Sequence, residues 1–242
     1  MDRISLLAAL ERDGLAFADS CTAAGLNAPV VACPGWNVAD LVWHLGEVHH
    51  FWLSIVGGLM QSPNDYADPK RPADDQLVDW YGAGFTETVQ VLTDVDPASP
   101  VWTWSDDHTA GFVVRRMAHE TAVHRWDADQ ASQRTMPVEA TLAGDGIDEF
   151  LQHFLNGGGG GVKPVAGSVH LHCGDVPGEW TVRTGNDGQV QVTREHAKGD
   201  CAIRGTASDI LMTLWRRRPV SVVEVIGDRD LAERFVAQSK LE

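Results

Sequence analysis

Residues 115–127, which read RRMAHETAVHRWD, contain side chains that commonly bind divalent metal ions. Glu120 and His124 are four positions apart, so a helix would place both on one face, with Asp127 one turn further along. A carboxylate and an imidazole placed in this way suit zinc or a similar ion. His119 lies about 140° around such a helix from His124, so the zinc-protease motif HExxH is absent and that class of enzyme is excluded.

A third metal ligand must come from another helix, and His44 is the natural candidate. It lies in the run Trp43-His44-Leu45, in the middle of an otherwise apolar segment, where an imidazole needs a polar partner. Three protein ligands leave a coordination position open, which is typical of catalytic rather than structural zinc sites. The same residues also allow a simpler interpretation, with His44 a satisfied core histidine and Glu120 and His124 a solvated pair.

Other histidines are predicted to lie outside this site. His49 and His50 are expected at the protein surface. His170 and His172 are two positions apart and would share one face of a predicted strand. Exposure to solvent is favoured for this pair, and a second metal site is the alternative.

The first half of the chain has the periodicity of helices. Asn37 is predicted to cap one of them, with Asp40 in its first turn. Residues 102–104 are predicted to form a short extended segment. Apolar residues recur about every 3.6 positions in five segments, which are Ile4 to about Ala24, Val38 to about Leu59, Ala73 to Leu92, Gly111 to Gln130 and Val138 to Leu155.

The second half begins after Asn156, where residues 157–161 are all glycine. Because a run of glycines cannot sustain a helix, we predict a linker over 157–163. The periodicity then changes to two, which predicts strands at 168–172, 180–183, 190–193 and 201–204, with a hairpin turn at 185–188. A helix at 207–216, a strand at 222–226 and a closing helix at 228–240 follow. The predicted fold is α+β with two domains, a helical bundle over 1–156 and a small α/β domain over 164–242.

Composition limits the classes of partner. The formal net charge of −15 argues against nucleic acid and anionic membranes, because both attract clustered Lys and Arg. No apolar run is as long as a transmembrane helix and no secretory signal is visible, so we expect a cytoplasmic protein. Wide spacing argues against a zinc ribbon or a disulfide framework for the four cysteines, Cys21, Cys33, Cys173 and Cys201.

Two segments together resemble the mycothiol-dependent maleylpyruvate isomerase family of actinobacteria, namely CPGWNVADLVWHL at 33–45 and RMAHETAVHRWD at 116–127. LWRRRP at 214–219, followed by VEVIGD at 223–228, is similar to the C-terminal domain of that family. The resemblance implies a DinB-like four-helix bundle followed by a small α/β domain similar to sterol carrier protein domains. It also implies that His44, Glu120 and His124 hold zinc and that Arg217 acts in catalysis.

The function that this resemblance implies is a metal-dependent enzyme that uses mycothiol, either a cis–trans isomerase or an S-transferase acting through a zinc-bound thiolate. Its partners would be a small-molecule thiol and an electrophilic substrate, and the protein would be a monomer or a homodimer. The alternative is a non-catalytic member of the DinB-like superfamily that binds a metal or ligand or has a regulatory role. Many DinB-like proteins use three histidines, so His49 and His119 remain alternative ligands.

Neighbouring side chains have expected supporting roles. Arg217 would bind a substrate carboxylate through two hydrogen bonds, although Arg216 and Arg218 flank it. Asp127 would support His124 as its hydrogen-bond partner, and the adjacent Arg125 would pair with Asp127 or Asp129. Five tryptophans either line the pocket or pack in the core, namely Trp36, Trp43, Trp102, Trp104 and Trp126.

Overall fold

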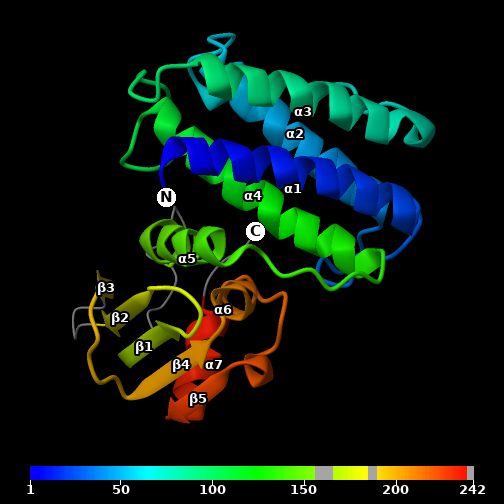
Figure 1. Cartoon of the computed structure of the whole chain (residues 1–242). Coiled ribbons are helices and arrows are strands. Elements are labelled where there is room, and N and C mark those ends of the chain that lie inside the picture. Colours follow the sequence, from blue (N-terminus) through cyan, green and yellow to red (C-terminus); the bar gives the residue numbers. More distant parts are fainter. Residues whose placement is uncertain (156–165, 185–189, 239–242) are drawn as a thin grey trace. The chain divides into compact units, whose positions relative to one another are not determined.

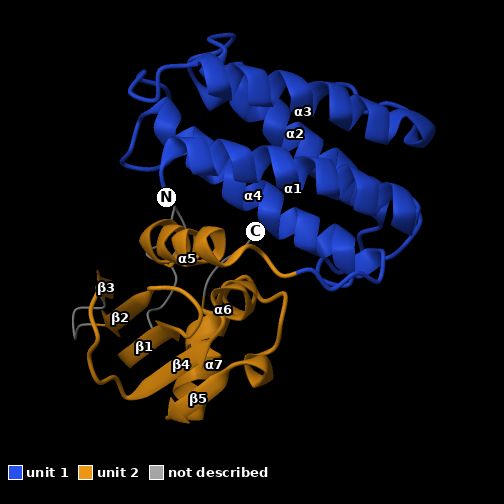
Figure 2. Ribbon diagram, in the orientation of Figure 1, with its two compact units in different colours: residues 1–136 blue, residues 137–242 orange. Residues whose placement is uncertain are grey.

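The computed structural model describes residues 1–155, 166–184 and 190–238. The chain forms two compact units, Met1–Met136 and Pro137–Glu242 (Figure 2). Helices make up the first unit, and the second combines a mixed sheet with helices (Figure 1). Within the described ranges, no helix is both long enough and apolar enough to cross a membrane. The predicted α+β class with two domains is confirmed.

The first unit, in which every residue is described, is a bundle of four long helices (Figure 1). They are α1 (Arg3–Ala24), α2 (Val38–Val56), α3 (Leu77–Asp94) and α4 (Ala110–Ala131). Helix α1 packs mainly against α4 and α2 mainly against α3, while contacts of α1 with α3 and of α2 with α4 complete the bundle. Two short 3₁₀ turns, η1 (Pro63–Asp65) and η2 (Asp74–Gln76), precede α3.

Side-chain caps determine where the helices begin. Asp2 accepts a hydrogen bond from the Ser5 amide at 2.7 Å at the start of α1. The predicted cap of α2 is present, since the Asn37 side chain accepts from the Asp40 amide at 3.0 Å and the Asp40 carboxylate accepts from the Asn37 amide at 3.1 Å. This reciprocal pair satisfies two backbone donors at the helix end. The cap sets the register of α2 and therefore the face on which His44 lies.

Large apolar side chains from all four helices form the bundle core. Two glycines let the helices approach closely. A Cβ on Gly46 would lie 2.3 Å from the Trp80 ring, and one on Gly14 would lie 2.2 Å from the Phe85 ring. The contact at Gly46 brings α3 against the helix that carries His44. The fully buried side chains include Leu10, Phe17, Leu41, Leu45, Tyr81 and Met117.

The loop before α4 differs from its prediction. Residues 102–104 form no strand but an irregular turn. The Thr103 hydroxyl donates to the Asp107 carbonyl at 2.8 Å, and this local bond competes with strand pairing. Trp102 stacks on Trp52 of α2, with ring centroids 6.2 Å apart. The alternating aromatic pattern therefore reflects packing against the bundle rather than an extended strand.

The described residues of the second unit form a five-stranded mixed sheet in the order β3-β2-β1-β4-β5. The strands are β1 (Gly167–Cys173), β2 (Glu179–Thr184), β3 (Val190–Thr193), β4 (Cys201–Gly205) and β5 (Glu224–Gly227). Strands β1 and β4 are parallel and the other neighbours are antiparallel. Helices α6 (Ala207–Leu214) and α7 (Arg229–Ala237) contact β1 and β4. The strand predicted at 222–226 is present as β5, which begins two residues later because a 3₁₀ turn, η4 (Val220–Val222), precedes it.

The two units divide before the fifth predicted helix rather than after it. That helix, α5 (Ala140–Glu149), continues into a π-helical turn, η3 (Phe150–Phe154), and packs against α6. Phe150 and Phe154 meet the Trp215 ring with centroids 5.2 and 4.8 Å apart. The expected domains 1–156 and 164–242 place α5 with the bundle, whereas the compact units place it with the sheet, since periodicity shows an apolar helix face but not which element covers it. The predicted linker at 157–163 and turn at 185–188 lie outside the described residues.

Strand β1 has two chemically different faces. Leu171 is buried on the face that meets the helices. His170 and His172 lie on the opposite face because side chains alternate along a strand, and Glu179 of β2 is paired with His172. The expected exposure is wrong for His170, which is 7% exposed, and His172 is half-buried.

Candidate metal centre

The structure brings His44, Glu120 and His124 together in the first unit. The Glu120 Oε1 atom is 3.5 Å from His44 Nε2 and 3.2 Å from His124 Nε2. The two imidazole rings meet edge to face, with centroids 4.9 Å apart. One potential ligand atom from each of the three residues lies within 4.8 Å of the others. Two nitrogens and one carboxylate oxygen therefore converge on one small region.

Helix geometry explains this convergence. Glu120 and His124 lie one turn apart on α4, and His44 lies on α2, which packs against α4. The Trp36 ring, just before the α2 cap, contacts the His44 ring with centroids 5.0 Å apart. Exposure decreases across the site, with side-chain values of 34% for His44, 18% for Glu120 and 7% for His124. The site is thus open to solvent on the side of His44.

Each ligand on α4 has a hydrogen-bond partner that orients it. Asp127 Oδ2 lies 2.9 Å from His124 Nδ1, as predicted, and this hydrogen bond orients the ring so that Nε2 faces Glu120. Arg116 forms an ion pair with Oε2 of Glu120 and leaves Oε1 facing the imidazoles. Asp127 is 1% exposed and Arg116 is 4% exposed. Buried partners of this kind hold ligand side chains in a fixed orientation.

Arg116 was not among the predicted site residues. Its signal in the sequence is the spacing of four positions to Glu120, which places the two side chains side by side on a helix. That spacing is common on solvated helix faces, so on its own it does not identify a buried ion pair.

The electrostatics of the site favour a bound cation. Burial opposes ionisation of Glu120, but the charge of Arg116 and hydrogen bonds to His124 and His44 hold the pKa of Glu120 well below its usual range. Burial also opposes protonation of His124, but Asp127 and Glu120 outweigh it and raise the pKa of His124 to about 9. The candidate ligands, two imidazoles and one carboxylate, fit a zinc-type ion. A second carboxylate as the hydrogen-bond partner of one imidazole is also typical of such sites.

The alternative histidine ligands occupy other positions. His49 is only 1% exposed, so the expectation that it lies at the surface is wrong. Its Nε2 is 2.9 Å from the Thr121 hydroxyl, and its ring packs against both Tyr81 and Phe85 with centroids 5.7 and 5.6 Å away. The surface expectation for His50 is also wrong, since this residue is half-buried.

His119 is likewise buried, at 2% exposed, and is not part of the cluster of potential ligands around Glu120. Burial of His49 and His119 follows from α2 and α4 being buried around most of their circumference, where α4 also buries polar residues.

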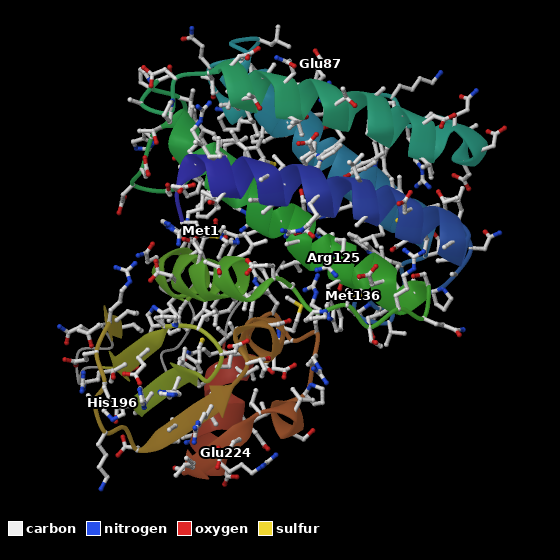
Figure 3. All side chains as sticks on the ribbon, in the orientation of Figure 1. Met1, Glu87, Arg125, Met136, His196 and Glu224 are labelled. Atoms are coloured by element: carbon white, nitrogen blue, oxygen red, sulfur yellow. The ribbon has the colours of Figure 1, made fainter. Side chains whose placement is uncertain are left out.

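Arg125, labelled on α4 in Figure 3, belongs to a separate buried network. Its guanidinium lies 2.6 Å from Asp129, which is one of the two partners predicted for it. It also lies 3.4 Å from Asp13 of α1. It also donates to the Met136 carbonyl at 3.0 Å. Ser20 of α1 donates to Asp129 at 2.6 Å. Arg125 therefore joins α4 to α1 and to the end of the first unit.

The tryptophans mostly pack against other aromatic rings. Trp36 contacts the ring of His44, as described above. Trp43 stacks on Trp80 at a centroid distance of 4.9 Å, and Trp104 meets the edge of Phe112 at 5.2 Å. Of the five tryptophans for which pocket and core positions were both open, Trp36 is thus the one with a described ring contact to a candidate ligand.

Arg217 lies in the second unit, just after α6. It is half-buried, and its guanidinium donates to the Trp215 carbonyl at 3.1 Å. Its neighbours differ from it, since Arg216 is exposed with a positive φ of 56° and Arg218 forms an ion pair with Asp209. Arg218 therefore already serves a structural role.

Comparison with solved structures shows the fold. A crystal structure of the mycothiol-dependent maleylpyruvate isomerase matches with a TM-score of 0.65 and 10% sequence identity, covering 93% of both chains. A histidine-to-alanine mutant of the mycothiol-dependent maleylpyruvate isomerase matches with a TM-score of 0.62 and 9% identity, again covering 93% of both chains. A search of curated proteins found no match.

Comparison with protein families gives a match in each unit. The mycothiol maleylpyruvate isomerase N-terminal domain matches residues 7–129, a range that contains all three candidate ligands. The C-terminal domain of the same family (MDMPI) matches residues 141–234. Neither match includes residues 130–140, the region in which the two compact units divide. This chain therefore belongs to the mycothiol maleylpyruvate isomerase family.

Proposed function

We propose that this chain is a metal-dependent enzyme that uses the thiol of mycothiol to attack an electrophilic substrate, as a cis–trans isomerase or an S-transferase. The observation that carries the proposal is the convergence of His44, Glu120 and His124 at a site open to solvent on one side. Family membership supports the choice of thiol, because relatives are described as mycothiol-dependent.

The residues fit a divalent ion of the zinc type, held by His44, Glu120 and His124. Such an ion, when bound, would lower the pKa of a thiol from about 8.5 and make the thiolate available at neutral pH. Asp127 orients His124 for this role, and Arg116 holds the second oxygen of Glu120.

The protein's own cysteines do not replace an external thiol. Burial raises the pKa of Cys173 to about 12 and that of Cys201 to about 11, and it raises the pKa of Cys21 as well. A buried thiol with a raised pKa is a poor nucleophile. Cys33 is half-buried, which makes it the one cysteine to test by substitution. Four free cysteines also suit the reducing cytoplasm in which we propose that the protein acts.

Arg217 is proposed to orient a carboxylate of the substrate. A guanidinium can donate two parallel hydrogen bonds to a carboxylate. The backbone amide of Arg217 donates to the Met212 carbonyl at 2.8 Å, which fixes the start of the side chain.

The test combines metal analysis with turnover. Protein purified without chelator is analysed for zinc and then assayed with mycothiol, using maleylpyruvate for isomerisation and a panel of electrophiles for mass-spectrometric detection of thiol adducts. We expect turnover that needs both metal and thiol and that is lost in His44→Ala, Glu120→Ala and His124→Ala. Cys33→Ser and His108→Ala, which lie outside the cluster, should retain it.

Each outcome of this test is informative. Isomerised product without adducts would identify an isomerase, and accumulated adducts would identify a transferase. A protein that binds zinc but forms no product or adduct would contradict the proposal and favour a non-catalytic role. Turnover that survives all three ligand substitutions would also contradict it.

A further inference from the structure

A second group of potential metal ligands lies in the sheet unit, on the face of β1 that does not meet the helices. His170 and His172 come from β1, Glu179 comes from β2, and His196 comes from the segment between β3 and β4. Figure 3 labels His196 beside the sheet. One potential ligand atom from each of the four lies within 4.8 Å of all the others. These residues share no member with the candidate centre of the first unit.

The carboxylate of Glu179 lies among the imidazoles. Its Oε1 atom is 2.5 Å from His172 Nδ1 and 3.1 Å from His196 Nδ1. The His170 ring meets those of His172 and His196 with centroids 6.0 and 5.0 Å apart.

His170 gives an independent indication of a ligand. It is 7% exposed, and its Nε2 atom is buried with no hydrogen-bond partner among the described residues. A buried polar atom of this kind is destabilising unless something satisfies it. A metal ion among the four residues would use the lone pair of an imidazole nitrogen.

The charged neighbours of the group already have partners. Arg183 pairs with Glu195 at 2.9 Å, and Arg194 pairs with Asp148. His172, Glu179 and His196 line a pocket in the surface, so a small ion can reach them from solvent. Neither arginine is therefore required to neutralise Glu179.

We propose that His170, His172, Glu179 and His196 bind a divalent transition-metal ion of the zinc type. Three imidazole nitrogens and one carboxylate oxygen suit zinc, whereas calcium and magnesium prefer oxygen ligands. Four protein ligands leave no position open, so the ion is structural. It links β1 and β2 to the segment after β3. Ligand atoms around tetrahedral zinc are separated by about 3.4 Å, so the distances of 2.5 and 3.1 Å from Glu179 to His172 and His196 lengthen when the ion binds.

The segment that contains His196 provides a direct readout. The His196 side chain is 75% exposed, and Arg194 and Lys198 on either side of it are both exposed. Trypsin cleaves after arginine and lysine, so it reports how tightly this segment is held. Binding of zinc by His196 should protect both peptide bonds.

The experiment uses the full chain with the first centre disabled by His44→Ala and His124→Ala. We expect chelator-treated protein to bind one equivalent of Zn²⁺ in equilibrium dialysis, and zinc to slow cleavage after Arg194 and Lys198 by at least about tenfold. Adding His172→Ala and His196→Ala should abolish both effects. Adding Glu195→Gln, a neighbouring carboxylate outside the group, should preserve them.

A single substitution keeps the test decisive if the multiple variant does not fold. Because the His196 side chain is mostly exposed, His196→Gln should fold normally and weaken zinc binding by more than about tenfold. Absence of zinc binding in the background without the first centre would overturn the proposal. Equal zinc binding with and without His196 would overturn it too. Loss of turnover in the chain with His44→Ala and His124→Ala tests only the proposed function and does not bear on zinc binding by the second group.

Discussion

The two oxygens of Glu120 have different partners, and this difference shows how the residues of the first centre share charge. Oε1 faces His44 and His124, whereas Oε2 pairs with Arg116, which is almost fully buried. Arg116 therefore compensates the carboxylate charge in the absence of a metal ion. When an ion binds at Oε1, it compensates the same charge. The folded state should then depend less on the arginine.

Arg116→Met tests this division of charge. Removing one partner of a buried ion pair destabilises a protein by about 3–5 kcal/mol. We expect that loss in urea unfolding with chelator present and a clearly smaller loss with excess zinc, since the ion then compensates Glu120. Arg115→Met, on the same helix but half-buried, should cause little change in either condition. Equal destabilisation by Arg116→Met with and without zinc would contradict this explanation.

Asp127 should affect metal affinity more than folding. Its carboxylate orients His124 through the hydrogen bond of 2.9 Å to Nδ1. Asp127→Asn keeps the shape but removes the charge, so we expect zinc affinity to fall by about 10–100-fold, as measured by competition with a chelating dye. Trp126→Phe on the adjacent, half-buried position is the control and should leave affinity unchanged. An unchanged affinity in Asp127→Asn would show that Asp127 does not support a metal ligand.

At the scale of elements, helix caps and periodicity predicted the parts of the bundle that hold the site. Reciprocal hydrogen bonds between Asn37 and Asp40 cap α2 at the predicted residue. Because the helix begins there, His44 lies on the side that meets α4. The spacing of Glu120 and His124 placed both on one face for the same reason. The burial of His49 was missed because periodicity identifies an apolar face without showing that α3 and α4 both cover it.

His49 should make the bundle sensitive to acid. Burial lowers the pKa of His49 to about 3; the charge of Glu120 opposes this shift, and His124 and His44 reinforce it. In the unfolded chain the pKa is about 6.5. Between these values the unfolded state binds a proton that the folded state does not, so stability falls as the pH is lowered through this window, by about 1.4 kcal/mol per pH unit.

The comparison that isolates this effect is His49→Gln. Glutamine can still hydrogen-bond Thr121 but does not titrate. Between about pH 6.5 and pH 5, the wild-type chain should lose about 2 kcal/mol more unfolding free energy than the variant, measured by urea denaturation. His108→Gln, at an exposed position in the loop before α4, should follow the wild type. Parallel losses in wild type and His49→Gln would show that His49 titrates normally.

At the scale of the whole molecule, the sequence predicted two domains and their classes, and the boundary it predicted differs from the division into compact units. A run of five glycines is a strong local signal, and it placed the boundary after α5. The partner of α5 is decided instead by distant residues, above all Trp215, which meets Phe150 and Phe154. The apolar periodicity of α5 does not show which distant residues the helix packs against. For a similar reason, the sequence favoured exposure of His170 and His172 over a second metal site. It did not show that His196 lies beside them, because His196 is in a segment with no strand pattern.

The boundary can be tested by expressing two N-terminal fragments that end on either side of α5. A fragment of residues 1–136 contains all three candidate ligands and should bind one zinc ion with an affinity within about threefold of the full chain, since their hydrogen-bond partners are also included. A fragment of residues 1–156 adds α5 without α6 and so exposes an apolar face that includes Leu142, Ile147, Phe150 and Leu151. Exposed apolar patches promote association, so we expect light scattering to show a monodisperse shorter fragment and an aggregating longer one. If the longer fragment were the better behaved of the two, α5 would belong with the bundle, and the boundary would lie at the glycine run after all.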